Sequence, residues 1–146
     1  MTRRATIAAF AAICVAALPA CGRAESEDEV RETVEQFFRD LAHNNGKSTC
    51  ARLTSRARAQ AVELADFPPG TPCERALGPD GDRWPPDAQR AVLSVRVRRA
   101  TVHASRAEVA DADVLLDEPL RSERRPNGRP FVLRRIDGRW LIEDLG

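Results

Sequence analysis

The chain has 146 residues, with 23 Lys and Arg against 22 Asp and Glu, and a formal net charge of +1. This length suits one ordinary domain with one hydrophobic core, and the nearly balanced charge argues against a nucleic-acid binder that relies on bulk positive charge. Two His, four Cys and no Tyr leave few residues for acid-base or metal chemistry.

The first twenty residues have the anatomy of a signal peptide. Arg3 and Arg4 precede an apolar run over residues 5–20, which is shorter than the ~20 residues that a membrane-spanning helix needs. The run ends in Leu18-Pro19-Ala20-Cys21, which resembles a bacterial lipobox. The sequence therefore predicts cleavage after residue 20, lipidation of Cys21 with palmitate-type chains, and anchoring at the extracytoplasmic face of the cell membrane.

The four cysteines fit this interpretation. Cys14 lies in the signal peptide and leaves with it, whereas the sulfur of Cys21 becomes a thioether. Cys50 and Cys73 remain as an even pair in an exported segment, where disulfides persist. A metal site or a reactive thiol is the alternative, but neither residue belongs to a C-x-x-C pair or has a His nearby. We expect a disulfide worth about 3 kcal/mol.

Residues 21–27 are expected to form a lipidated tether to a single domain over residues 28–146. Ser26 and Glu29 have the capping-box spacing and predict the start of a helix that ends near Asn44-Asn45-Gly46. Its buried face recurs at helical spacing, at Val30, Val34, Phe37, Phe38 and Leu41.

Two further helical segments are predicted before a loop. Residues 48–65 form a helical region with a break near Thr54-Ser55, and residues 71–77 form a short helix that begins with an N-cap and a proline. Residues 78–86 are rich in Gly and Pro and predict a loop. Trp84 in this loop is expected to cap the core, with a pocket rim or a partner contact as alternatives.

The second half of the chain predicts antiparallel strands. Residues 93–103 alternate between apolar and polar, a turn follows at Ser105-Arg106, and a second strand covers residues 107–116. After a charged loop over residues 117–130, residues 131–136 and 140–144 form a hairpin around Asp137-Gly138. Helices first and strands second predict the α+β class.

Several segments together resemble a known family. The first helix with its Phe37-Phe38 pair, Cys50-Ala51-Arg52-Leu53, Cys73-Glu74-Arg75-Ala76-Leu77 and the closing segment from Arg135 to Ile142 are similar to small secreted NTF2-like proteins, particularly short actinobacterial lipoproteins. The resemblance covers residues 28–145. It implies a cone of helices packed on a strongly curved antiparallel sheet, with a pocket at the open end. It does not assign a function, because this superfamily contains enzymes, carriers and dimerisation modules.

The sequence gives little support for a catalytic site. NTF2-like enzymes tend to place an Asp with a His or Tyr inside the cone, but we expect His43 at a helix end and His103 on an outward strand position to face solvent. Asp40 and Asp66 have no spacing that pairs them. Without a metal-ligand, nucleophile or phosphate-loop motif, we predict no catalytic residue, no metal and no cofactor.

Binding is the preferred alternative to a cone-pocket enzyme or an assembly module. Phe37, Phe38, Trp84 and Trp140 are the candidate pocket or contact residues, although most aromatic residues of a small domain belong to its core. The expected partners are the membrane, through Cys21, and a small ligand or an envelope protein. A basic stripe of Arg96, Arg98, Arg134 or Arg135, and Arg139 is weighed against a charge-balanced outer face, which we favour.

Overall fold

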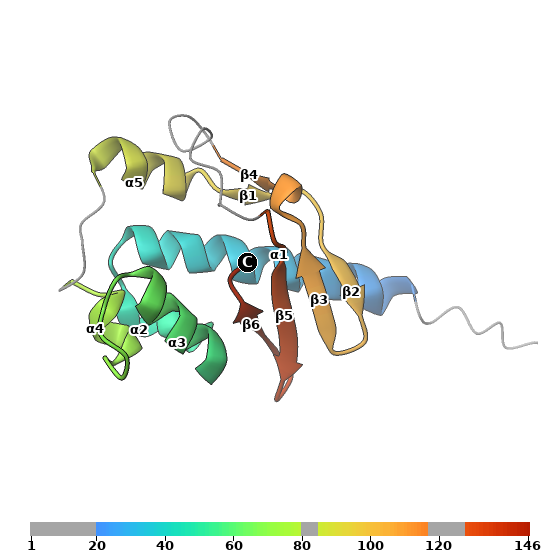
Figure 1. Cartoon of the computed structure of the whole chain (residues 1–146). Helices are drawn as coiled ribbons and strands as arrows, with labels where there is room; N and C mark the ends of the chain where they lie inside the picture. Colours follow the sequence, from blue (N-terminus) through green and yellow to red (C-terminus); the bar gives the residue numbers. More distant parts are fainter. Residues whose placement is uncertain (1–19, 80–84, 117–127) are drawn as a thin grey trace, which may run out of the picture.

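The computed structural model describes residues 20–79, 85–116 and 128–146. Its centre is a long helix that lies against a four-stranded antiparallel sheet with strand order β2-β3-β5-β6 (Figure 1). The helix is α1 (Ala20–Ala42), and the strands are β2 (Thr101–His103), β3 (Arg106–Val109), β5 (Phe131–Ile136) and β6 (Arg139–Asp144). The α+β class is confirmed, and in the described part of the chain the sheets do not close into a barrel or cone.

The smaller elements surround α1. Three short helices gather at its C-terminal end, and a fifth helix and a two-stranded antiparallel ladder lie along its side (Figure 1). They are α2 (Gly46–Ala51), α3 (Ser55–Leu64), α4 (Cys73–Ala76), α5 (Pro86–Leu93), β1 (Arg96–Val97) and β4 (Val114–Leu115). No helix in the described ranges is both long and apolar enough to cross a bilayer.

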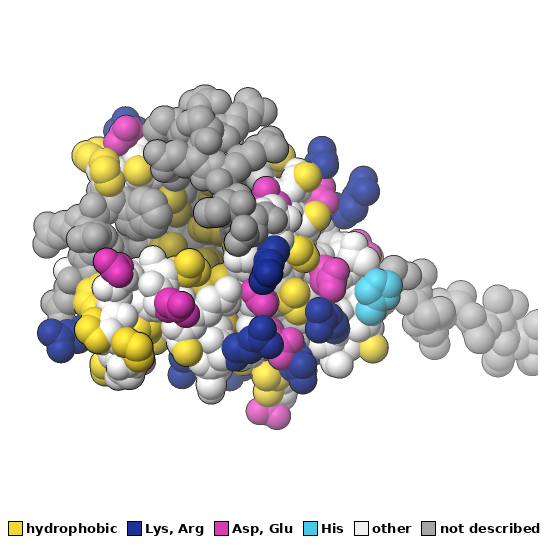
Figure 2. Space-filling model, viewed as in Figure 1, with side chains coloured by type: hydrophobic (Ala, Val, Ile, Leu, Met, Phe, Trp, Pro, Cys, Tyr) yellow, Lys and Arg dark blue, Asp and Glu magenta, His cyan; other side chains and the backbone are white. Residues whose placement is uncertain are grey.

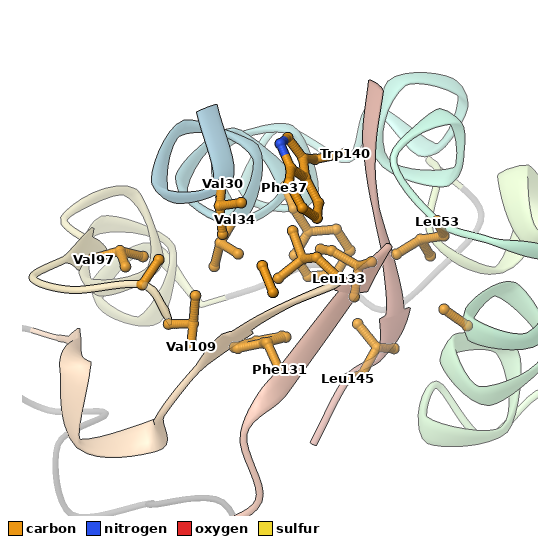
Figure 3. Packing of buried hydrophobic residues seen from close by; sticks show 14 of the residues in the cluster. Val30, Val34, Phe37, Leu53, Val97, Val109, Phe131, Leu133, Trp140 and Leu145 are labelled. Carbon is orange, nitrogen blue, oxygen red and sulfur yellow. The ribbon is translucent and has the colours of Figure 1, made fainter. Parts of the chain in front are cut away.

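The core lies between α1 and the inner face of the sheet (Figure 3). Val30, Val34 and Phe37 recur at helical spacing on α1, as predicted, and all three are buried. They pack in one cluster with the inward residues of β5 and β6, which are Phe131, Leu133, Trp140 and Ile142. Phe38 is half-buried and meets the Phe131 ring edge-on, with the ring centroids 5.6 Å apart.

The predicted start of α1 is wrong. The helix begins at Ala20, so residues 21–27, expected as a tether, are part of it. Apart from Gly22 this stretch consists of residues that a helix tolerates at small cost, and a capping-box pair does not interrupt a helix that already has a preceding turn. The predicted stop also shifts, because α1 ends at Ala42 and Asn44, not Gly46, takes the left-handed conformation (φ 53°).

The helical region over residues 48–65 breaks where the sequence predicts. Its second part, α3, begins after Thr54, whose hydroxyl accepts a hydrogen bond from the Ala57 N–H at 3.3 Å. Asn45 caps α2 in the same way through the Ser48 N–H. The disulfide predicted between Cys50 and Cys73 is present and joins α2 to the first residue of α4, with the two Cα atoms 6.1 Å apart.

The predicted strand over residues 93–103 is confirmed only in part, because the structure places two short strands, β1 and β2, within it and ends α5 at Leu93. Residues 86–93 form α5, which begins at the Pro85-Pro86 pair because proline favours the first turn of a helix. After β1, the exposed Arg98 and Arg99 interrupt the alternation, so β1 pairs with β4 whereas β2 pairs with β3. The predicted strand over residues 107–116 is likewise divided into β3 and β4 by a short 3-10 turn at Asp111–Asp113.

Both predicted turns between strands are confirmed, the first of them one residue earlier than predicted. The β2–β3 turn lies at Ala104 and Ser105, next to the predicted position, and Asp137-Gly138 connects β5 to β6. Asp137 and Gly138 both have positive φ (50° and 77°), as the tight turn of a two-residue hairpin requires. Trp84 and most of the predicted loop over residues 117–130 lie outside the described residues.

The C-terminal end of β6 is held to α3. The Asp144 carboxylate accepts hydrogen bonds from the Gly146 N–H at 3.1 Å and from Gln60 Nε2 at 3.2 Å. The backbone hydrogen bond from Gly146 is the main reason why the pKa of Asp144 lies below its ordinary value, and partial burial opposes this shift. These contacts hold α3 beside the outer edge of the sheet.

Gly46 marks a close approach between α2 and α4. A Cβ atom there would overlap the Glu74 carbonyl oxygen and lie 2.8 Å from the Gly78 nitrogen. Because both neighbours are backbone atoms, we expect Gly46→Ala to lower the free energy of unfolding by about 1–3 kcal/mol in urea titrations. Lys47→Ala, at the exposed next residue, is the control and should stay within about 0.5 kcal/mol of the original. An unchanged Gly46→Ala variant would contradict the close approach.

The disulfide can be tested by counting thiols. A chain that begins at residue 22 contains only Cys50 and Cys73, so we expect no titratable thiol before reduction and two afterwards. Replacing both residues by Ala should lower the free energy of unfolding by about 3 kcal/mol, because the unfolded chain is then no longer constrained. Two thiols that titrate without reductant would refute the pairing.

Candidate functional site

A cleft of about 360 Å³ lies between α1, the end of α2 and the β5–β6 hairpin, and we call it the Trp140 cleft. Its lining residues are Glu29, Glu32, Thr33 and Gln36 of α1, Ala51 and Arg52, and Gly138, Arg139, Trp140 and Leu141 of the hairpin. The α1 residues recur at helical spacing and so form one wall. This wall is adjacent to the face of α1 that carries Val30, Val34 and Phe37. The orientation of α1 about its axis that buries this face therefore also places the wall beside the hairpin.

Trp140 contributes little of its ring to the cleft surface, because the residue is only 5% exposed. Its indole N–H donates to Glu29 Oε2 at 3.2 Å. The Arg135 guanidinium lies 5.9 Å from the Trp140 ring centroid and 3.6 Å from the same Glu29 oxygen. Glu29 thus joins α1 to both strands of the hairpin and fixes one side of the cleft.

Arg52, on another side of the cleft, is held by a buried carboxylate. Asp40 is 8% exposed, and its Oδ2 accepts from Arg52 Nε at 2.9 Å while Oδ1 accepts from Gln36 Nε2 at 3.1 Å. From the sequence, no spacing pairs Asp40 with Asp66, and the Gln36 and Arg52 contacts of Asp40 were not predicted. The Gln36–Asp40 spacing on one helix face was a usable signal, whereas the Asp40–Arg52 pair depends on how α2 folds back on α1.

The other candidate residues do not meet at this cleft. His43 and His103 are exposed, as predicted, and Val102 beside His103 is buried. Phe37 belongs to the core, and Phe38 packs against it. Of the four candidate pocket aromatics, only Trp140 lines the Trp140 cleft within the described residues.

Asp66 lies at a different cleft. This second cleft, of about 500 Å³, is formed by α3 and the segment that leads to α4, and it includes Val62, Phe67 and Cys73. Asp66 has a positive φ (57°) at the end of α3. Asp66 is therefore not paired with Asp40, as predicted, because the Asp40 carboxylate is bound by Arg52 and Gln36.

The basic stripe, the alternative that we did not favour, does not form across neighbouring strands. β1, which carries Arg96, pairs with β4 and not with the hairpin. Two arginines of that stripe are matched by acidic groups, because the guanidinium of Arg98 lies 2.8 Å from the Asp113 carboxylate and that of Arg134 lies 2.8 Å from Glu143. Arg106, elsewhere on the sheet, likewise lies 3.3 Å from Glu108. Figure 2 shows acidic and basic side chains mixed over the exposed face of the sheet, which confirms the charge-balanced alternative.

Comparisons with known proteins give no assignment. No family model, curated protein or solved structure matches the chain. Within the described ranges, no group of three or more His, Cys, Asp or Glu side chains is arranged to hold a metal ion.

The Asp40–Arg52 pair can be tested by a double-mutant cycle. Their side chains are 12% and 32% exposed, and so we expect Asp40→Ala and Arg52→Ala to show a coupling energy of about 1–3 kcal/mol in the free energy of unfolding. The pair Arg106–Glu108, with both side chains about half exposed, is the control and should couple by less than about 1 kcal/mol. Equal couplings would show that burial does not strengthen the Asp40–Arg52 contact.

Proposed function

We propose that this chain is a lipoprotein of the extracytoplasmic face of the cell membrane, anchored through Cys21, whose NTF2-like domain binds a ligand in the Trp140 cleft without catalysing a reaction. The observation that carries the proposal is the state of the cysteines. Cys50 and Cys73 form a disulfide, as is usual for an exported domain, and Cys21 stands directly after a signal-like apolar run.

The arrangement of helices and strands supports the NTF2-like part of the proposal. A long N-terminal helix packs on the inner face of an antiparallel sheet, and shorter helices follow it in the chain before the strands begin. This is the order of elements that the resemblance implies. The cone itself is part of the proposal.

The cleft supports binding more than catalysis. Glu29 is engaged by Trp140 and Arg135, and the Asp40 carboxylate is engaged by Arg52 and Gln36. Carboxylates held in this way have little access to a reacting group, which a general acid or base needs. Glu32, the other carboxylate of the lining, has no His beside it in the lining to act with it. The two histidines lie outside the cleft lining.

The position of the cleft along α1 fits a role at the membrane. Glu29 and Gln36 lie eight and fifteen residues after Cys21 in one continuous helix, which corresponds to about 12 and 23 Å along the axis at ~1.5 Å per residue. A diacylglycerol on Cys21, with a further chain on its amine, gives stable anchoring. A ligand of the cleft would then be found close to the bilayer surface.

Fatty-acid labelling tests the anchor. In a lipoprotein-processing bacterial host grown with labelled palmitate, we expect the full-length protein to incorporate label and Cys21→Ala to incorporate none and to accumulate as precursor. Cys14→Ala, which changes a cysteine within the apolar run, is the matched control and should be labelled and processed. Label that persists on Cys21→Ala would overturn the proposal.

A further inference from the structure

β6 is the edge strand of the four-stranded sheet, and part of its outer edge is already covered. The Ile142 N–H donates to the Arg52 carbonyl at 2.8 Å, and the Ile142 carbonyl accepts from the Thr54 N–H at 2.9 Å. Residues 52–54 thus form a short parallel bridge centred on Leu53 and Ile142. Beyond this bridge, toward the Asp137-Gly138 turn, the edge borders the Trp140 cleft.

The main chain of Trp140 faces this uncovered part of the edge. Backbone groups alternate in direction along a strand, so the N–H and C=O of Trp140 point to the same side as those of Ile142, two residues later. Arg135, the residue opposite Trp140, confirms the phase, because its N–H donates to Ser105 on the other side of β5 at 2.7 Å. Within the described ranges, no hydrogen bond to this Trp140 N–H or C=O is present.

Two charged side chains of opposite sign line the same cleft as Trp140. Glu32 on the α1 wall and Arg139 on the hairpin both line the cleft and are exposed. Neither forms an ion pair with another described residue. The remaining charges of the lining, Glu29 and Arg52, are matched by Arg135 and Asp40.

We infer that the Trp140 cleft binds a short peptide with free termini, which adds to the edge of β6. The peptide backbone pairs with the N–H and C=O of Trp140, its terminal ammonium group lies toward Glu32, and its terminal carboxylate lies toward Arg139. This assignment names the ligand class of the proposed binding function and rests on that function.

The geometry favours a peptide over other ligands and a short one over a long one. Trp140 is only 5% exposed as a whole residue, so its ring gives little surface for stacking a sugar or an aromatic group. Its main-chain N–H and C=O, in contrast, have no hydrogen-bond partner among the described residues. Pairing cannot extend far, because Ile142 is already covered and β6 begins at Arg139, directly after the turn. A cleft of about 360 Å³ also lies near the small end of ligand pockets, ~300–1,000 Å³.

Amide hydrogen exchange measured by NMR on the ¹⁵N-labelled full chain in detergent tests the inference. Without ligand, we expect the Trp140 amide to exchange at least about tenfold faster than the Ile142 amide, because only the latter is hydrogen-bonded. Trialanine with free termini should shift the Trp140 amide resonance saturably, with a Kd of about 1 mM or tighter, and slow its exchange. N-acetyl-trialanine amide should bind about tenfold more weakly or not at all, and N-acetylglucosamine should leave the resonance unchanged.

Variants separate the cleft from the rest of the sheet. Glu32→Gln and Arg139→Gln should each weaken trialanine binding about three- to tenfold, and Ala51→Trp should abolish it by filling the cleft from the exposed end of α2. Arg106→Gln, on the same sheet but outside the lining, is the control and should bind as the original. A slowly exchanging Trp140 amide in the free protein, equal binding of the capped peptide, or binding unaffected by Ala51→Trp would overturn the inference. If palmitate labelling succeeds while trialanine fails, the anchor stands and the ligand class falls.

Discussion

The burial of one face of α1 against β5 and β6 determines most of this structure. Val30, Val34 and Phe37 are almost fully removed from water, and each such side chain contributes about 1.5–3 kcal/mol when it is buried completely. Since the helix is a rigid cylinder at ~100° per residue, fixing this face also fixes its neighbours. Glu29, Glu32, Thr33 and Gln36 must then stand beside the hairpin, and Glu35 faces β1, where its carboxylate accepts the Val97 N–H at 2.9 Å.

Patterns that arise from local physics were readable in the sequence. The buried stripe of α1, the helix break near Thr54-Ser55, the Asp137-Gly138 turn and the exposure of His43 and His103 each depend on a few neighbouring residues. The paired cysteines were also predictable, because Cys50 and Cys73 are the two cysteines outside the predicted signal peptide and lipobox and have no C-x-x-C spacing or neighbouring His to suggest a metal site.

Features that depend on distant partners were not readable. The alternation over residues 93–103 suits one strand, yet β1 and β2 belong to different sheets because their partners β4 and β3 lie apart. The same limit applies to the cleft. Asp40 meets Arg52 only through the turn between α1 and α2, and the open amide of Trp140 is recognisable only once residues 52–54 are known to cover Ile142.

The continuity of α1 from Ala20 gives the proposed anchor a rotational consequence. A flexible tether would let the domain turn freely relative to Cys21, whereas a continuous helix that includes this proposed lipidation residue fixes the angle between Cys21 and the cleft about the helix axis. Adding one residue between Cys21 and Glu29 would rotate the Trp140 cleft by about 100° and lift it by only about 1.5 Å. The number of residues between Cys21 and Glu29 would therefore determine the direction in which the cleft opens relative to the proposed anchor.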